Sequence, residues 1–251
     1  MAARDDLTLP LEPEAYYHIY NRGNNKNNIF FEEANYSFFL KRYVKYTDAY
    51  LDTFCYCLLP NHFHFLIRVK KMDKILSTAK KSYLKVPQRL LYKLRIEFPN
   101  LDFPDFRNLE NLIEAPPLSN IDKQLWQYQV ACWLISEQLR KFFLSYTKAV
   151  NKKANREGSL MRKNFRRKPI DDNSYLKYLI WYIHNNPVHH GIWTDLKTYP
   201  WSSYELLMSH KQTWLRRKEI LAILEGRENA LIFHQKNWER KKGLREFVIE
   251  K

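Results

Sequence analysis

Long apolar runs are missing from this 251-residue sequence. No uninterrupted apolar stretch approaches the roughly 20 residues that a helix needs to span a bilayer. The first 14 residues also lack the charged-then-apolar layout of a secretory signal peptide. Both absences predict a soluble protein inside the cell.

Cysteine is scarce as well. The chain contains three cysteines, an odd number, and so few in this length do not build a disulfide framework. We therefore expect a reducing compartment and a cytoplasmic location. Internal repeats and low-complexity tracts are not evident either, which predicts an ordinary cored domain.

Acidic residues are outnumbered by basic ones. The chain has 42 Lys and Arg against 27 Asp and Glu, a formal net charge of +15. Such an excess favours an extended polyanion as partner, with nucleic acid first among the candidates. Aromatic residues make up 16% of the chain. Most must lie in the core, and any exposed rings would suit stacking on unpaired bases.

Hydrophobic periodicity and turn-forming residues divide the chain into strands and helices. The predicted strands are residues 15–20, 51–59, 62–69 and a stretch ending at 170. The predicted helices are residues 32–50, residues 125–155 and a helix that starts near 173 and ends at the Asn186-Pro187 step. Residues 71–122 are loosely patterned and rich in proline, and we assign them little function.

This order of elements predicts an α+β fold, a ferredoxin-like antiparallel sheet with helices packed on one face. The predicted domain spans residues 15–205 and carries a helical insertion at about 71–122. Residues 206–251 are basic and are expected to form a helical C-terminal extension.

His62 and His64 lie two residues apart in a predicted strand. Side chains alternate between the faces of a strand, so both imidazoles should project from one face and share a metal ion. Two imidazoles leave coordination positions open, as a catalytic metal requires. Two ordinary strand histidines are the simpler alternative.

Cys55 and Cys57 raise a different possibility, a structural zinc site shared with the two histidines. If the hairpin turns on residues 59–61, Tyr56 opposes His64, and the cysteines fall on the face away from the histidines. We therefore expect the cysteines to pack in the core. A register shift of one residue would reverse this conclusion.

Tyr182 and Asn186 stand four residues apart on a predicted helix, so they share one face. A phenol and an amide at the end of an aromatic stripe favour function over simple packing. The amide oxygen of Asn186 would suit a hard ion such as Mg²⁺ or Mn²⁺. A core stripe that ends in a helix-terminating asparagine is almost equally compatible with the pattern.

A basic segment with an interleaved aromatic, residues 162–168, follows several lysines near 148–153. Little acid lies nearby, so phosphate binding is favoured over a merely solvated surface. The predicted DNA-binding residues are Arg22, Lys148, Lys152, Arg162, Lys163, Arg166, Arg167 and Lys168.

Four segments together resemble the REP-associated tyrosine transposases of the HUH (His-hydrophobic-His) superfamily. They are residues 17–24 (YHIYNRGN), 56–67 (YCLLPNHFHFLI), 182–188 (YIHNNPV) with Gly191, and 201–204 (WSSY). The resemblance implies a ferredoxin-like core, usually in a homodimer. It also implies that His62, His64 and Asn186 are the metal ligands and that Tyr182 is the nucleophile.

The resemblance further implies a metal-dependent transposase or endonuclease that cleaves and rejoins single-stranded or hairpin DNA through a 5′-phosphotyrosine. The expected cofactor is Mg²⁺ or Mn²⁺, and the expected location is cytoplasmic, with the nucleoid. Two departures are the long 71–122 segment and the pair His189-His190. The alternatives are a non-catalytic nucleic-acid-binding protein that has kept the fold and a structural zinc protein.

Overall fold

The computed structural model describes residues 9–81, 86, 88–99, 109–114 and 120–236. Parts of the 71–122 segment and the last 15 residues of the C-terminal extension therefore lie outside the described residues. Within the described part, no helix has both the length and the apolar character needed to cross a membrane.

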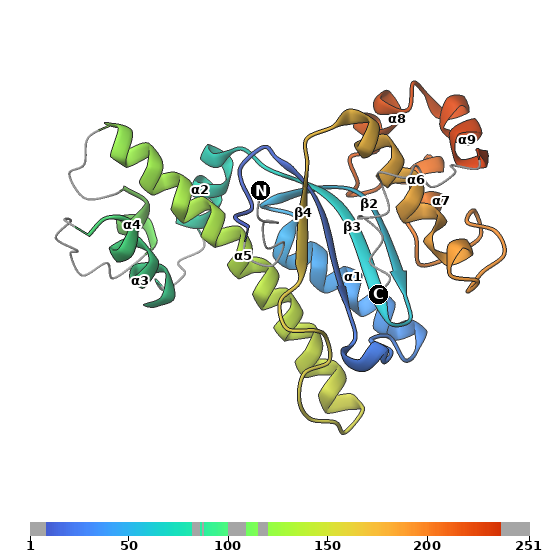
Figure 1. The fold of residues 1–251 in the computed structure, drawn as a ribbon, viewed down its shortest axis with the longest axis horizontal. Coiled ribbons are helices and arrows are strands. Elements are labelled where there is room, and N and C mark those ends of the chain that lie inside the picture. The colour runs from blue at the N-terminus through green and yellow to red at the C-terminus, as the bar shows by residue number, and fades with distance from the viewer. Residues whose placement is uncertain (1–8, 82–85, 87, 100–108, 115–119, 237–251) are drawn as a thin grey trace, which may run out of the picture.

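One four-stranded sheet organises the fold (Figure 1). Its strands are β1 (Tyr16–Arg22), β2 (Leu51–Leu59), β3 (His62–Val69) and β4 (Arg166–Ile170). They lie in the order β2-β3-β1-β4, and every neighbouring pair is antiparallel. Helix α1 (Glu33–Thr47) connects β1 to β2, and helix α5 (Asn120–Lys153) precedes β4. The α+β class and the ferredoxin-like order of strands and helices are confirmed.

The first face of the sheet is covered by α1 and α5, and aromatic rings fill the space between them. Phe63 and Phe65 project from β3 into this layer. The ring of Phe63 lies 5.1 Å from that of Phe39, and the ring of Phe65 stacks on Tyr43 at 4.2 Å. Such pairs add to the burial of apolar area that drives folding. This layer is the main core of the protein.

The second face is covered by α6 (Asn173–His189), which corrects the prediction that helices pack on one face only. Asp172 caps the start of α6, where its side chain accepts a hydrogen bond of 2.7 Å from the backbone N–H of Tyr175. Most of α6 is buried, and it packs against apolar residues of β2 and β3 such as Cys57, Leu59 and Leu66. The sheet is thus a central layer between helices (Figure 1).

The end of α6 also differs from its prediction, because the helix continues past Pro187 to His189. Pro187 lies in the final turn, so the backbone hydrogen bond that it removes is at the helix end and the preceding turns stay intact. Its carbonyl accepts hydrogen bonds from the backbone N–H groups of Ile192 and Trp193 at 2.9 and 3.1 Å. These bonds close the helix end and hold Asn186 inside the helix.

Shorter helices extend both ends of the molecule (Figure 1). From the 71–122 segment come α2 (Met72–Lys80), α3 (Gln88–Glu97) and α4 (Leu109–Glu114), which pack with the N-terminal half of α5. Beyond α6 come α7 (Tyr204–Met208), α8 (Arg217–Ile223) and α9 (Arg227–Gln235). A short 3-10 turn, η1 (Asn24–Lys26), follows β1. The insertion therefore shares the main core of the domain.

Candidate active site

The two histidines of β3 follow a two-residue turn at Pro60 and Asn61. Leu59 pairs with His62, and Cys57 pairs with His64. This register is shifted by one residue from the prediction, so the cysteines lie on the same face as the histidines. The prediction that the cysteines face the other way was wrong, because the turn spans two residues and not three.

Cys55 and Cys57 are nevertheless packing residues of the layer under α6. Both are fully buried, and burial raises the pKa of both thiols, which keeps them protonated. Among the described residues, no three His, Cys, Asp or Glu side chains are placed to hold one metal ion. A zinc ion held by these cysteines and the two histidines is therefore not supported.

Asn61, in the turn itself, orients the ring of His62. The amide nitrogen of Asn61 donates to the carbonyl of Lys26 at 3.1 Å, so its amide oxygen faces Nδ1 of His62 at 2.6 Å. A carbonyl oxygen only accepts, so Nδ1 carries the proton and Nε2 keeps its lone pair. Burial lowers the pKa of His62 to about 3, with His190 and Arg22 contributing and Asn186 opposing the shift. The ring is thus neutral and ready to act as a ligand.

His64 is held in the same way by a histidine of β1. Nδ1 of His64 lies 2.9 Å from Nε2 of His18, and both rings are buried. Nε2 of His64 is buried and has no hydrogen-bond partner within the described residues. Burial lowers the pKa of His64 well below its ordinary value. A neutral His64 that donates from Nδ1 to His18 presents its Nε2 lone pair to the site.

Helix α6 brings Tyr182 and Asn186 against these histidines. The ring of Tyr182 lies 5.7 Å from that of His64 and 6.3 Å from that of His18, edge-on to both. The amide nitrogen of Asn186 donates to the carbonyl of Tyr182 at 2.9 Å. The amide oxygen is buried and has no hydrogen-bond partner in the described part of the chain. An unpaired buried acceptor costs free energy unless a ligand satisfies it.

A cavity of about 10 Å³ lies beside His62, His64 and Tyr182, with room for about one water molecule or ion. It is lined by Tyr20, Asn21, Arg22, His62, His64, Tyr182 and His190. A nucleotide is far too large for this space. A polymeric substrate would therefore have to present one phosphate oxygen at the mouth of the cavity.

The basic residues predicted to bind DNA divide between surfaces. Lys148, Lys152, Arg162 and Lys163 are exposed near the end of α5 and in the loop that follows. In β4, Arg166 pairs with Tyr20 and Lys168 with His18, so both lie on the face of the histidines. Arg167 pairs with Ile19, faces the other way and is buried. Arg22 lines the cavity itself.

His18 and Asn61, which orient the two candidate ligands, were not predicted as site residues from the sequence. His190 was noted only as a departure from the family, yet its ring lies 4.9 Å from that of His62. The alternation of Tyr16, His18 and Tyr20 along β1 was the signal for the first of these. It places His18 on one face of the strand, but only the pairing of β1 with β3 shows that this is the face of His64.

No protein-family model matches the sequence, and no curated protein matches it. Among solved structures, the chain is similar to one described as a "REP associates tyrosine transposase bound to a REP hairpin". The likeness covers 84% of this chain and 87% of that chain, with 13% identity and a TM-score of 0.49.

Proposed function

We propose that this protein is a metal-dependent endonuclease and strand transferase of single-stranded DNA, with Tyr182 as the nucleophile. One observation carries the proposal: two buried acceptors without hydrogen-bond partners among the described residues, His64 Nε2 and Asn186 Oδ1, lie close to Tyr182, whose ring is 5.7 Å from that of His64 and which precedes Asn186 by one turn of α6. They do so in a chain of net charge +15, which favours a polyanionic substrate.

The donor set fits a hard divalent ion such as Mg²⁺ or Mn²⁺. Asn61 leaves Nε2 of His62 with its lone pair, Nε2 of His64 has no partner among the described residues, and Asn186 contributes a neutral oxygen. Two nitrogens and one oxygen leave positions open for a phosphate oxygen. When bound, such an ion polarises the scissile phosphate and spreads the charge that builds on its oxygens.

Tyr182 supplies the attacking oxygen. Its place on a capped, buried helix fixes its ring beside His64, which favours an in-line approach to a phosphate at the cavity mouth. The phenol loses its proton, its oxygen bonds to phosphorus, the bond from phosphorus to the 3′ oxygen breaks, and that oxygen takes up a proton. The products are a 5′-phosphotyrosine and a 3′-hydroxyl.

Rejoining follows from the same chemistry. A 3′-hydroxyl of another strand attacks the phosphotyrosine, restores a phosphodiester and returns the phenol, so no ATP is consumed. Duplex DNA would not readily bring a phosphate to a buried tyrosine. Single strands and the flanks of hairpins are therefore the proposed substrates, and a homodimer is the proposed assembly.

Formation of a covalent adduct tests this proposal. The purified protein is incubated with Mn²⁺ and end-labelled single-stranded oligonucleotides that contain hairpins from its own genomic flanks. A denaturing gel should show label at the mass of the protein. Tyr182→Phe should abolish this band and leave binding to the oligonucleotide intact, because it removes one hydroxyl only.

Tyr178→Phe is the matched control, since Tyr178 lies one turn earlier on α6 and its ring is 6.1 Å from that of Tyr182. This variant should form the adduct at the normal level. An adduct that persists in Tyr182→Phe contradicts the assignment of the nucleophile. Binding without any adduct, across several flanks and metals, indicates a non-catalytic nucleic-acid-binding protein.

A further inference from the structure

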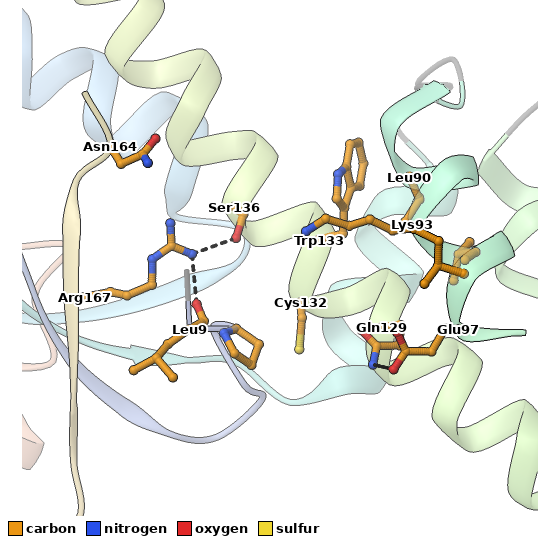
Figure 2. Close-up of a pocket in the computed structure, with 13 residues that line it drawn as sticks. Leu9, Leu90, Lys93, Glu97, Gln129, Cys132, Trp133, Ser136, Asn164 and Arg167 are labelled. Carbon is orange, nitrogen blue, oxygen red and sulfur yellow. Dashed lines mark hydrogen bonds between the residues drawn. The ribbon is translucent and has the colours of Figure 1, made fainter. Parts of the chain in front are cut away.

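A second pocket lies on the other side of the sheet, between α3, α5 and the end of the loop into β4 (Figure 2). Its volume of about 600 Å³ is within the range of roughly 300–1,000 Å³ typical of sites for small molecules. Leu90 and Leu94 from α3 and Trp133 from α5 make an apolar wall. Lys93 and Arg167 bring positive charge to the same pocket.

Arg167 is the unusual member of this lining because only 8% of it is exposed. Its Nη1 donates to the carbonyl of Leu9 and to Oγ of Ser136, both at 3.1 Å. The guanidinium lies 4.2 Å over the ring of Phe165. Its Nε is buried and has no hydrogen-bond partner within the described residues. Leu9 and Ser136 thus hold the group in place, and neither of them neutralises its charge.

No described carboxylate forms an ion pair with Arg167. Burial lowers its pKa to about 10, so the group stays charged at neutral pH. A buried charge without a counter-charge is costly, and a bound anion would remove this cost. The planar guanidinium matches the oxygens of a phosphate in particular.

The two ends of the pocket have opposite character. Figure 2 shows Arg167 at one end, and Glu97 with Gln129 well away from it. The amide nitrogen of Gln129 donates to Glu97 at 3.1 Å, so the carboxylate sits at the α3 end. A phosphate would be repelled there and attracted to Arg167. An amide and a carboxylate instead suit the donors and acceptors on the edge of a nucleobase.

The position of β4 connects this pocket with the candidate active site. β4 is an edge strand, and its residues alternate between the two faces of the sheet. Arg166 and Lys168 lie on the face of the histidines, while Arg167 lies on the face of the pocket. A nucleic-acid strand that crosses the edge at β4 therefore meets basic side chains on both faces.

We propose that this pocket binds one nucleotide unit, with its phosphate at Arg167 and Lys93 and its base against Trp133 and the leucines of α3. The proposal rests on the proposed nucleic-acid substrate, and it gives the 71–122 segment a role in substrate binding. The unit could come from a DNA strand held at β4 or from a free mononucleotide. Both sources share the same phosphate and base.

Calorimetry on the full chain without added metal tests the site, using the four deoxynucleoside 5′-monophosphates, the nucleosides and inorganic phosphate. We expect a monophosphate to bind at least about 10-fold more tightly than its nucleoside or phosphate alone. Arg167→Gln and Trp133→Leu should each weaken this binding by about 10- to 100-fold. Lys93→Gln, at an exposed position, should weaken it by a smaller factor.

Lys218→Gln is the control, because Lys218 is an exposed lysine on α8, which packs on β2 at the opposite edge of the sheet. It should bind the nucleotide as the unchanged protein does. Circular dichroism and a melting curve check that Arg167→Gln is folded. If that variant unfolds, Trp133→Leu and Lys93→Gln together decide the result.

Photocrosslinking distinguishes the two sources. A single strand with one 5-bromodeoxyuridine per oligonucleotide should crosslink to the α5 peptide that contains Trp133 if a strand occupies the pocket. Mononucleotide binding without this crosslink assigns the site to a free nucleotide.

Three results would overturn the proposal. The first is binding that is unchanged in all three pocket variants, and the second is equal binding of phosphate and nucleotide. The third is the absence of binding by both monophosphates and strands. Loss of cleavage alone would overturn only the proposed function, because these measurements need no cleavage.

Discussion

The two faces of the sheet are built from the same strands but carry opposite chemistry. On β3, Phe63 and Phe65 join the aromatic layer under α1 and α5, whereas His62 and His64 face α6. The first face contains matched apolar surfaces. The second keeps two buried acceptors that have no hydrogen-bond partner in the described part of the chain, His64 Nε2 and Asn186 Oδ1. Both faces bury apolar surface and stabilise the fold, and the second also retains acceptors beside a tyrosine that a ligand would satisfy.

The sharpest test of this contrast compares neighbours on β3. Phe65→Ala should lower the free energy of unfolding by about 3–5 kcal/mol, since it leaves a cavity in the main core. The double change His62→Ala with His64→Ala should abolish metal-dependent cleavage. Per substituted residue, it should lower the free energy of unfolding by less than Phe65→Ala does. Urea denaturation and the adduct assay measure the two effects. A double variant that loses its fold as completely as Phe65→Ala would remove the distinction between the faces.

His18 sharpens the comparison further, because it acts through His64. We expect His18→Leu to weaken binding of Mn²⁺ by about 10- to 100-fold, since partners of ligating histidines set their orientation and basicity. His18→Gln keeps an acceptor for Nδ1 of His64 and should restore most of the affinity. Electron paramagnetic resonance of Mn²⁺ gives the affinity without any cleavage. Equal affinity in all three proteins would show that His18 only fills space.

Acid should destabilise the packing on the second face of the sheet before that on the first. His234 of α9 is buried against His184 of α6, with its Nε2 2.9 Å from Nδ1 of that ring, and the ring of Tyr204 lies 5.0 Å away. Burial lowers the pKa of His234 to about 4 from the ordinary 6.5, although its bond to the carbonyl of Ala230 opposes the shift. The unfolded chain therefore takes up the proton first as pH falls. The stability that depends on a neutral His234 is fully present above pH 6.5, and it is lost as the pH falls from 6.5 to 4.

The depressed pKa of His234 should lower the free energy of unfolding by about 2 kcal/mol between pH 7 and pH 5. Denaturation curves at both pH values, for the unchanged protein and for His234→Gln, measure the part of this pH dependence that comes from His234. The variant should show a smaller difference between the two pH values. A difference as large as that of the unchanged protein would mean that other groups carry the acid sensitivity.

The smallest effect is expected at the surface of β4. Arg166 is exposed on the face of the histidines, so Arg166→Gln should leave stability within about 0.5 kcal/mol. It should weaken binding of single-stranded DNA a few-fold and reduce the slope of log K against log salt by about 1. Titrations at several salt concentrations give that slope. An unchanged slope would place the DNA backbone away from this strand.

Local periodicity accounts for what was predicted correctly. The alternation of a strand put His62 and His64 on one face, and the spacing of a helix put Tyr182 and Asn186 on another, because both periods are properties of the backbone alone. The order of these elements then indicated the ferredoxin-like sheet. The sequence by itself thus determined the class of fold and which side chains share a face.

Only the tertiary structure decided which faces meet. The turn at Pro60 and Asn61 set the register of β2 and brought Cys57 opposite His64. The burial of α6 on the second face placed Tyr182 beside that histidine. The docking of α3 on α5 made a pocket around Arg167, which sequence analysis had placed in one basic surface. Such contacts depend on the burial of surfaces far apart in the chain, and no local period of the sequence records that burial.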